Sequence, residues 1–301
     1  MAVDIKNTRT YKEIIQEART NINKLHALNI EVPTGSWFFD ALVQAELAEQ
    51  QRLFGNLEDY TSNPLNRLKT TTAYGNLSEI NFIISEIDRL VETSGHVVKK
   101  KINDVLRMPL RMLDESSDTG TNMGRNILFE LRLAARFVRA GYSPVLNVAH
   151  PDIFIPTSGF NYAIECKRVF SAKKFEDLTS RAIDQLEKNS LGENNWLGIV
   201  AISITRHFHG GDKKLYGESS DRISEFADKE TDRFIKEKLP FIHRKFPTNI
   251  PCLILDFSDL AESDIPYWIH FLSIVETSND SAASKYQFVL KDLAALKTNQ
   301  T

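Results

Sequence analysis

The chain has 301 residues and a formal net charge of −3. This length allows one large domain or two smaller ones, and the weak negative charge excludes a protein that coats nucleic acid through a strongly basic surface. The two cysteines, Cys166 and Cys252, lie in apolar segments, which excludes a disulfide scaffold and a four-cysteine zinc site. Because the sequence shows no signal peptide and no stretch long enough to span a membrane, we expect a cytoplasmic protein without membrane contacts.

Residues 1–115 are predicted to form a mainly helical region. Apolar residues recur at helical spacing in the segments 11–30, 37–54 and 76–113. The turn-rich sequence YTSNPLN interrupts this pattern, and Pro109 should end or kink the last helix. Amphipathic helices of this kind suit contacts with another protein, so we expect the region to support a homodimer or a larger complex, or to contact DNA.

Residues 116–301 are predicted to form a second region in which helices and strands are mixed, beginning within the polar linker 114–124. The expected order is a helix at 125–141, strands at 142–148, 152–156 and 161–170, a helix at 175–188, a strand at 196–205, a helix at 221–246 and a strand at 250–258. Edge strands are expected at 268–276 and 285–290. This order predicts an α/β fold.

The predicted strand NYAIECKRVF carries two charged residues among its apolar ones. Glu165 and Lys167 are two positions apart, so their side chains point to the same face of the strand. The preceding segment DIFIP begins with Asp152, and the turn at Ser158-Gly159 predicts a hairpin that brings Asp152 close to both charges. Two carboxylates beside a lysine can hold Mg²⁺ against a phosphate and orient a water molecule, whereas the alternative is a structural ion pair at a strand end.

Glu130 is the acidic residue of the predicted helix 125–141, and it falls within the apolar arc of that helix. The arginines of the helix project to the opposite face; they are Arg125, Arg132, Arg136 and Arg139. Because an unpaired buried carboxylate is expensive, we expect a metal ion or Lys167 to be the partner of Glu130.

Glu130 on a helix, then Pro151-Asp152 and Glu165-Cys166-Lys167, resemble the motif of the PD-(D/E)XK nuclease superfamily over about residues 122–205. The resemblance implies a restriction-endonuclease-like fold, in which a mixed sheet is flanked by helices. It also implies that Asp152 and Glu165 bind Mg²⁺ or Mn²⁺, that Lys167 assists the attacking water, and that Glu130 completes the metal site.

Several other polar residues have a structural and a functional interpretation. Some branches of the superfamily carry a glutamine on the helix after the motif strand, and Gln185 is the candidate, although we expect it to be solvated. Arg168 points away from Lys167 and should have a packing or surface role. His207 and His209 share a strand face without an evident third metal ligand, so a role at a loop edge is favoured. The basic stretches at 97–112 and 236–245 are expected to be solvated helix faces or phosphate contacts.

The sequence therefore predicts a metal-dependent nuclease that hydrolyses DNA, with RNA left open as a substrate. The resemblance implies a setting such as restriction or anti-phage defence. The alternatives are a catalytically silent module of the same fold that binds nucleic acid or a protein, and a chain whose function depends on its N-terminal helices.

Overall fold

The computed structural model describes residues 3–7, 10–108, 123–169, 171–189, 195–205, 215–216, 220–262, 266–277, 283–293 and 296. The first half of this part of the chain contains β1 (Val3–Asn7), α1 (Tyr11–Ala27), α2 (Trp37–Leu53), α3 (Leu57–Ser62), α4 (Pro64–Ser85), α5 (Ile87–Arg107) and α6 (Met123–Arg139). The second half contains β2 (Val145–Leu146), β3 (Ile153–Ile155), β4 (Asn161–Arg168), α7 (Ala172–Asn189), β5 (Trp196–Ser203), β6 (Leu215–Tyr216), α9 (Ser220–Lys245), β7 (Cys252–Glu262), β8 (Pro266–Glu276) and α10 (Ala283–Asp292). Within these described residues, no helix is long and apolar enough to cross a membrane.

The strands form one mixed sheet, which confirms the α/β prediction. Their order is β1-β8-β7-β5-β4-β3-β2, and β6 pairs with the far part of β7. The central strands β4, β5 and β7 are parallel, whereas β2, β3, β8 and β1 are added antiparallel at the two sides. Helix α7 makes the crossover between the parallel strands β4 and β5, as a parallel pair requires.

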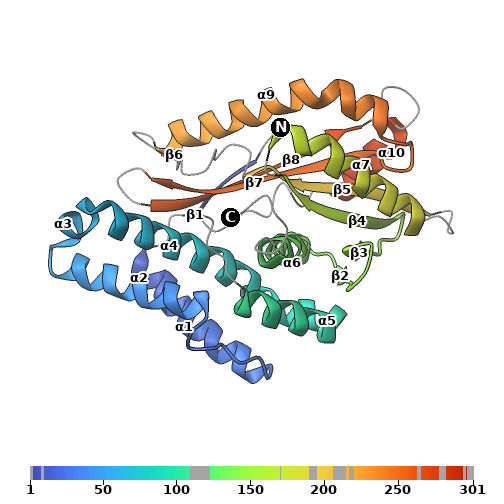
Figure 1. Ribbon diagram of the computed structural model, residues 1–301. Coiled ribbons are helices and arrows are strands. Elements are labelled where there is room, and N and C mark those ends of the chain that lie inside the picture. The colour runs from blue at the N-terminus through green and yellow to red at the C-terminus, as the bar shows by residue number, and fades with distance from the viewer. Residues whose placement is uncertain are drawn as a thin grey trace.

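Helices cover both faces of the sheet (Figure 1). One apolar core joins α1, α2, α4, α5 and α6 to residues such as Ile164 on β4 and Ile199 on β5. A second core joins α7 and α9 to the alternate residues of the same strands, including Ala163 and Val200. Because side chains alternate along a strand, each central strand contributes to both cores. The two cysteines are buried and free.

Helices α1 to α5 occupy most of residues 11–107, and their apolar faces are used within the chain. The helices break at Asn63, within the predicted interruption YTSNPLN, and α4 begins directly at Pro64. Proline is tolerated there because the first N–H groups of a helix have no partner within the helix. The apolar residues of α1, α2, α4 and α5 belong to the same core as α6 and the sheet. Pro109 and the predicted boundary at residue 115 lie outside the described residues, and the proposed dimer or complex stays a prediction.

The two edge strands predicted in the C-terminal part of the chain are not observed as edge strands. The segment 285–290 forms the helix α10 rather than an edge strand, because Tyr286, Val289 and Leu293 are buried at helical spacing. The segment 268–276 is a strand, β8, but it is not an edge strand. β1, in the region that was expected to be mainly helical, pairs antiparallel with β8 from Val3 opposite Leu272 to Asn7 opposite Trp268.

Three arginines of α6 are buried on the face that was expected to lie opposite the core, namely Arg125, Arg132 and Arg136, whereas Arg139 is partly exposed. Glu79 on α4 accepts hydrogen bonds from Arg125, at 3.1 Å, and from Arg132. Arg132 also donates to Asp256 on β7. The helix is therefore enclosed on two sides, because α4 and β7 supply carboxylates that compensate the buried guanidinium groups.

Arg136, one turn after Arg132, shows the cost of this arrangement. Its side chain is 5% exposed, and its three guanidinium nitrogens have no hydrogen-bond partner among the described residues. Burial lowers the pKa of Arg136 to about 9, against the attraction of Asp256.

A cavity of about 20 Å³, large enough for a water molecule, borders the arginine network. Its lining consists of Glu79, Arg125, Phe129, Arg132, Arg168, Ser203, Thr205 and Ser258.

Gly198 on β5 allows the close packing of α7 and the loop before β7. A Cβ atom at this position would lie 2.7 Å from Cγ1 of Ile250 and 3.3 Å from Cδ1 of Leu186. We therefore expect Gly198→Ala to lower the free energy of unfolding by about 1–3 kcal/mol, as overpacking of a core does. Urea unfolding should show the loss, whereas Gly35→Ala, with no atom within 4 Å of the added Cβ, should change stability by less than about 0.5 kcal/mol. Equal stability of both variants would contradict the packing argument.

Candidate functional site

The predicted hairpin forms and brings Asp152 to the motif strand. β3 and β4 are antiparallel, with Ile153 opposite Ile164, so Asp152 lies immediately before β3 and beside the middle of β4. The backbone N–H of Cys166 donates a hydrogen bond of 2.8 Å to Oδ2 of Asp152. This bond fixes the Asp152 carboxylate between the two residues that the motif places on either side of Cys166.

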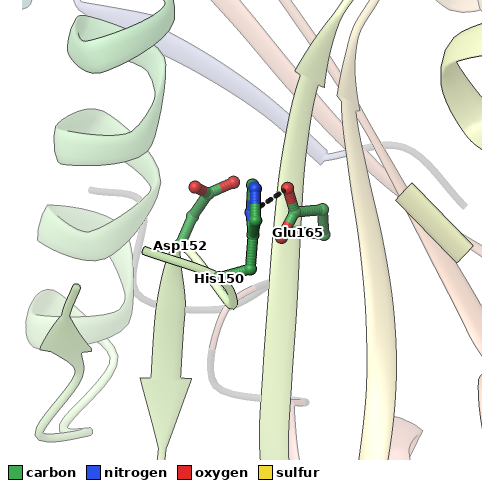
Figure 2. Close-up of side chains that lie close together, drawn as sticks. All are labelled: His150, Asp152 and Glu165. Atoms are coloured by element: carbon green, nitrogen blue, oxygen red, sulfur yellow. Dashed lines mark ion pairs between the residues drawn. The ribbon is translucent and has the colours of Figure 1, made fainter. Parts of the chain in front are cut away.

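Glu165 is the buried centre of the site. Its residue exposure is 0%, and its Oε1 accepts a hydrogen bond of 2.6 Å from the Lys167 ammonium. Nδ1 of His150 lies 2.8 Å from the same oxygen, and Figure 2 shows the imidazole between Asp152 and Glu165. The other oxygen, Oε2, has no hydrogen-bond partner among the described residues. A buried carboxylate oxygen without a partner is costly, and a cation is the group that would compensate it.

The pKa values of two carboxyl groups at the site, Glu165 and Glu130, are raised. Burial is the main cause for Glu165, followed by the nearby negative charge of Asp152, whereas Lys167 and His150 act in the opposite direction. The pKa of Glu130 rises to about 7, again through burial first and Asp152 second, against the attraction of Lys101. Burial and the charge of Asp152 both disfavour the ionised carboxylates, and a bound cation would offset both effects.

Glu130 lies on the site side of α6, and its observed partner is Lys101 rather than the expected Lys167. Its carboxylate pairs with the ammonium of Lys101 on α5, and each side chain is 12% exposed. Metal binding by Glu130 stays a prediction. Lys101 was noted in the sequence only as part of a basic stretch, because its approach to α6 depends on how two distant helices pack.

His150 and Gln185 are the site residues whose place the sequence analysis did not predict. Nε2 of His150 lies 2.7 Å from Nε2 of Gln185 on α7, so Gln185, although partly exposed, contacts the site. Its Oε1 is buried and has no hydrogen-bond partner among the described residues. The sequence places His150 two residues before Asp152, which indicates that it lies near the site. The direction of its side chain could not be predicted, because a loop has no regular repeat.

The other candidates lie apart from this cluster or outside the described residues. Arg168 borders the arginine cavity on the α6 face of the sheet, in agreement with a packing role. Lys238 in the second basic stretch forms ion pairs with Glu176 and Glu237. His207 and His209 fall outside the described residues.

No family of proteins, curated protein or solved structure was found to match the chain. The function of the chain is therefore inferred from the chemistry of the cluster itself.

Proposed function

We propose that the chain is a metal-dependent nuclease of the PD-(D/E)XK type that hydrolyses phosphodiester bonds in DNA. The observation that carries this proposal is the convergence of Asp152, Glu165 and Lys167 around a buried carboxylate oxygen without a partner. The order of a helix, an antiparallel hairpin, a crossover helix and a parallel strand, α6 to β5, supports a restriction-endonuclease-like core.

The residues divide the chemistry among them. Asp152 and Glu165 would hold the divalent cation, which lowers the pKa of a bound water and neutralises charge on the phosphate. Lys167 reaches the site from the same strand face as Glu165 and would orient the attacking water and stabilise developing negative charge. Lys173 and Lys174 are placed at the start of α7, directly after the motif strand, where Lys174 is exposed and suited to contact the nucleic-acid backbone.

The test is cleavage of supercoiled and linear DNA by the full chain with Mg²⁺, Mn²⁺ or EDTA, with single-stranded DNA and RNA as further substrates. We expect metal-dependent cleavage of DNA that falls by at least about 100-fold in Asp152→Asn, since loss of even an outer partner of a metal costs 10- to 100-fold. Asp184→Asn, which alters an exposed carboxylate on α7, is the matched control and should cleave like the wild type.

Three results would refute the proposal. They are cleavage that persists in EDTA, cleavage that Asp152→Asn does not impair, and no cleavage of any of these substrates with either metal. Cleavage of RNA alone would keep the chemistry and reject DNA as the substrate.

A further inference from the structure

We propose that His150 is a metal ligand, and that it forms with Asp152 and Glu165 a centre that selects a divalent transition-metal ion such as Mn²⁺ over Mg²⁺. This inference rests on the proposed function, because that function makes the cluster the active site. What it adds is the identity of the bound metal and of the atoms that hold it. One ligand atom from each of the three residues lies within 4.8 Å of the others, close enough to surround a single ion. Figure 2 shows all three side chains directed toward one another from the β3–β4 hairpin.

The contacts of Glu165 indicate where the ion would be held. Its Oε1 is shared by Lys167 and His150, and its Oε2 is buried without a hydrogen-bond partner among the described residues. Asp152 keeps one oxygen on the Cys166 N–H, which leaves the other oxygen of the carboxylate for a ligand. The imidazole and the two carboxylates thus offer a set of three donors on one short hairpin.

Glu130 is the competing candidate for the third ligand, and its ion pair argues against it. Its carboxylate is bound to Lys101, and both side chains are largely buried. Moving Glu130 to a metal would leave the Lys101 ammonium without that partner in a poorly solvated position, which is costly. His150 pairs through Nδ1 with Glu165, which is itself a proposed ligand, so an ion bound between the two would replace that contact without stranding a buried charge.

Gln185 supports His150 as a second-sphere residue. A metal-binding histidine usually donates its other ring N–H to an oxygen, which fixes the tautomer that ligates the metal. Gln185 contacts Nε2 of His150, and its own Oε1 is buried without a hydrogen-bond partner among the described residues. A half-turn of the Gln185 amide would let Oε1 accept the Nε2–H of His150 and would leave Nδ1, the nitrogen beside Glu165, for the metal.

The donor set determines the preferred metal. Mg²⁺ takes oxygen ligands and retains much of its water shell, whereas imidazole nitrogen suits transition-metal ions. Two carboxylates with one imidazole therefore favour an ion that accepts both donor types, and Mn²⁺ is the suitable probe because it also accepts carboxylate oxygen readily.

The test measures metal binding directly on the full-length, metal-stripped protein, by electron paramagnetic resonance of free Mn²⁺ and by calorimetry with Mn²⁺ and Mg²⁺. We expect the wild type to bind Mn²⁺ at least about 10-fold more tightly than Mg²⁺. His150→Ala should weaken Mn²⁺ binding by at least about 10-fold and reduce the preference over Mg²⁺. The matched control is His96→Ala, which removes an exposed imidazole on α5 and should leave binding unchanged.

Two further variants separate the ligand from its neighbours. Glu130→Gln should bind Mn²⁺ like the wild type, whereas Gln185→Ala should weaken binding by about 10- to 100-fold. Gln185→Glu should restore most of that loss, because a carboxylate still accepts the His150 N–H. Unchanged circular dichroism and thermal midpoint establish that each variant is folded, and His150→Asn replaces His150→Ala if the latter is not.

The inference is overturned if His150→Ala and His150→Asn bind Mn²⁺ like the wild type, if Glu130→Gln loses binding instead, or if the wild type does not prefer Mn²⁺. Its failure is distinct from that of the nuclease proposal. Binding that depends on His150 without cleavage of any nucleic acid would support the metal centre and reject the nuclease, whereas metal-dependent cleavage with no effect of His150 on binding would do the reverse.

Discussion

Lys167→Ala is expected to slow DNA cleavage by about 10²- to 10⁴-fold, the usual contribution of a side chain that handles a proton in the reaction. The Lys167 ammonium lies 2.6 Å from Oε1 of Glu165, and its side chain is 19% exposed, so it contacts both the buried carboxylate and the surface of the site. Single-turnover cleavage at saturating protein is the measurement, because it isolates the chemical step from product release.

The same variant distinguishes a catalytic lysine from a structural one. Lys167→Ala removes no carboxylate or imidazole, so binding of Mn²⁺ should persist while cleavage is lost, unlike the result expected for Asp152→Asn. Lys12→Ala, at an exposed position on α1, is the control for a general loss of positive charge. A cleavage rate for Lys167→Ala equal to that of the wild type would show that another group orients the water.

The second large effect concerns stability. We expect Glu79→Ala to lower the free energy of unfolding by about 3–5 kcal/mol, the cost of removing one partner from a buried ion pair. Glu79 is 3% exposed and pairs with both Arg125 and Arg132, so its loss leaves two buried guanidinium groups short of a counter-charge. Arg132 would keep its ion pair with Asp256, and Arg125 would keep its hydrogen bond to Oδ1 of Asn76.

Equilibrium unfolding in urea, followed by circular dichroism, measures this effect. Glu92→Ala, which removes an exposed carboxylate from α5, is the matched control and should change stability by less than about 0.5 kcal/mol. A loss below about 1 kcal/mol for Glu79→Ala would mean that the arginines find water or another acid when Glu79 is removed.

The parts of the site that local periodicity determines were predictable from the sequence. The two-residue spacing of Glu165 and Lys167 places both side chains on one face of β4, and the short turn before it fixes the hairpin that carries Asp152. The helical repeat of α6 likewise directs Glu130 toward that hairpin. These are relations within one element or between two consecutive ones.

The residues that were missed depend on contacts between distant or irregular segments. Lys101 approaches Glu130 only because α5 packs on α6, and the sequence separation of 29 gives no sign of it. His150 lies in a loop, where no repeat determines the direction of a side chain. The helical repeat of α6 also predicted the angle of its arginines but not that α4 and β7 would enclose them, since periodicity describes one helix without its neighbours.

The position of Arg132 has an evolutionary consequence. This one side chain bonds to Glu79, 53 positions away in sequence, and to Asp256, 124 positions away. The same guanidinium group therefore neutralises a buried carboxylate on α4 and another on β7. With Lys101 of α5 beside Glu130, residues from the N-terminal helices support the hairpin centre as well. We infer that the gene segment encoding residues 123–301 cannot be exchanged by recombination without the segment encoding α4 and α5. Separation of the two would leave buried charges unpaired and an apolar face exposed to water. The two segments should therefore be inherited together.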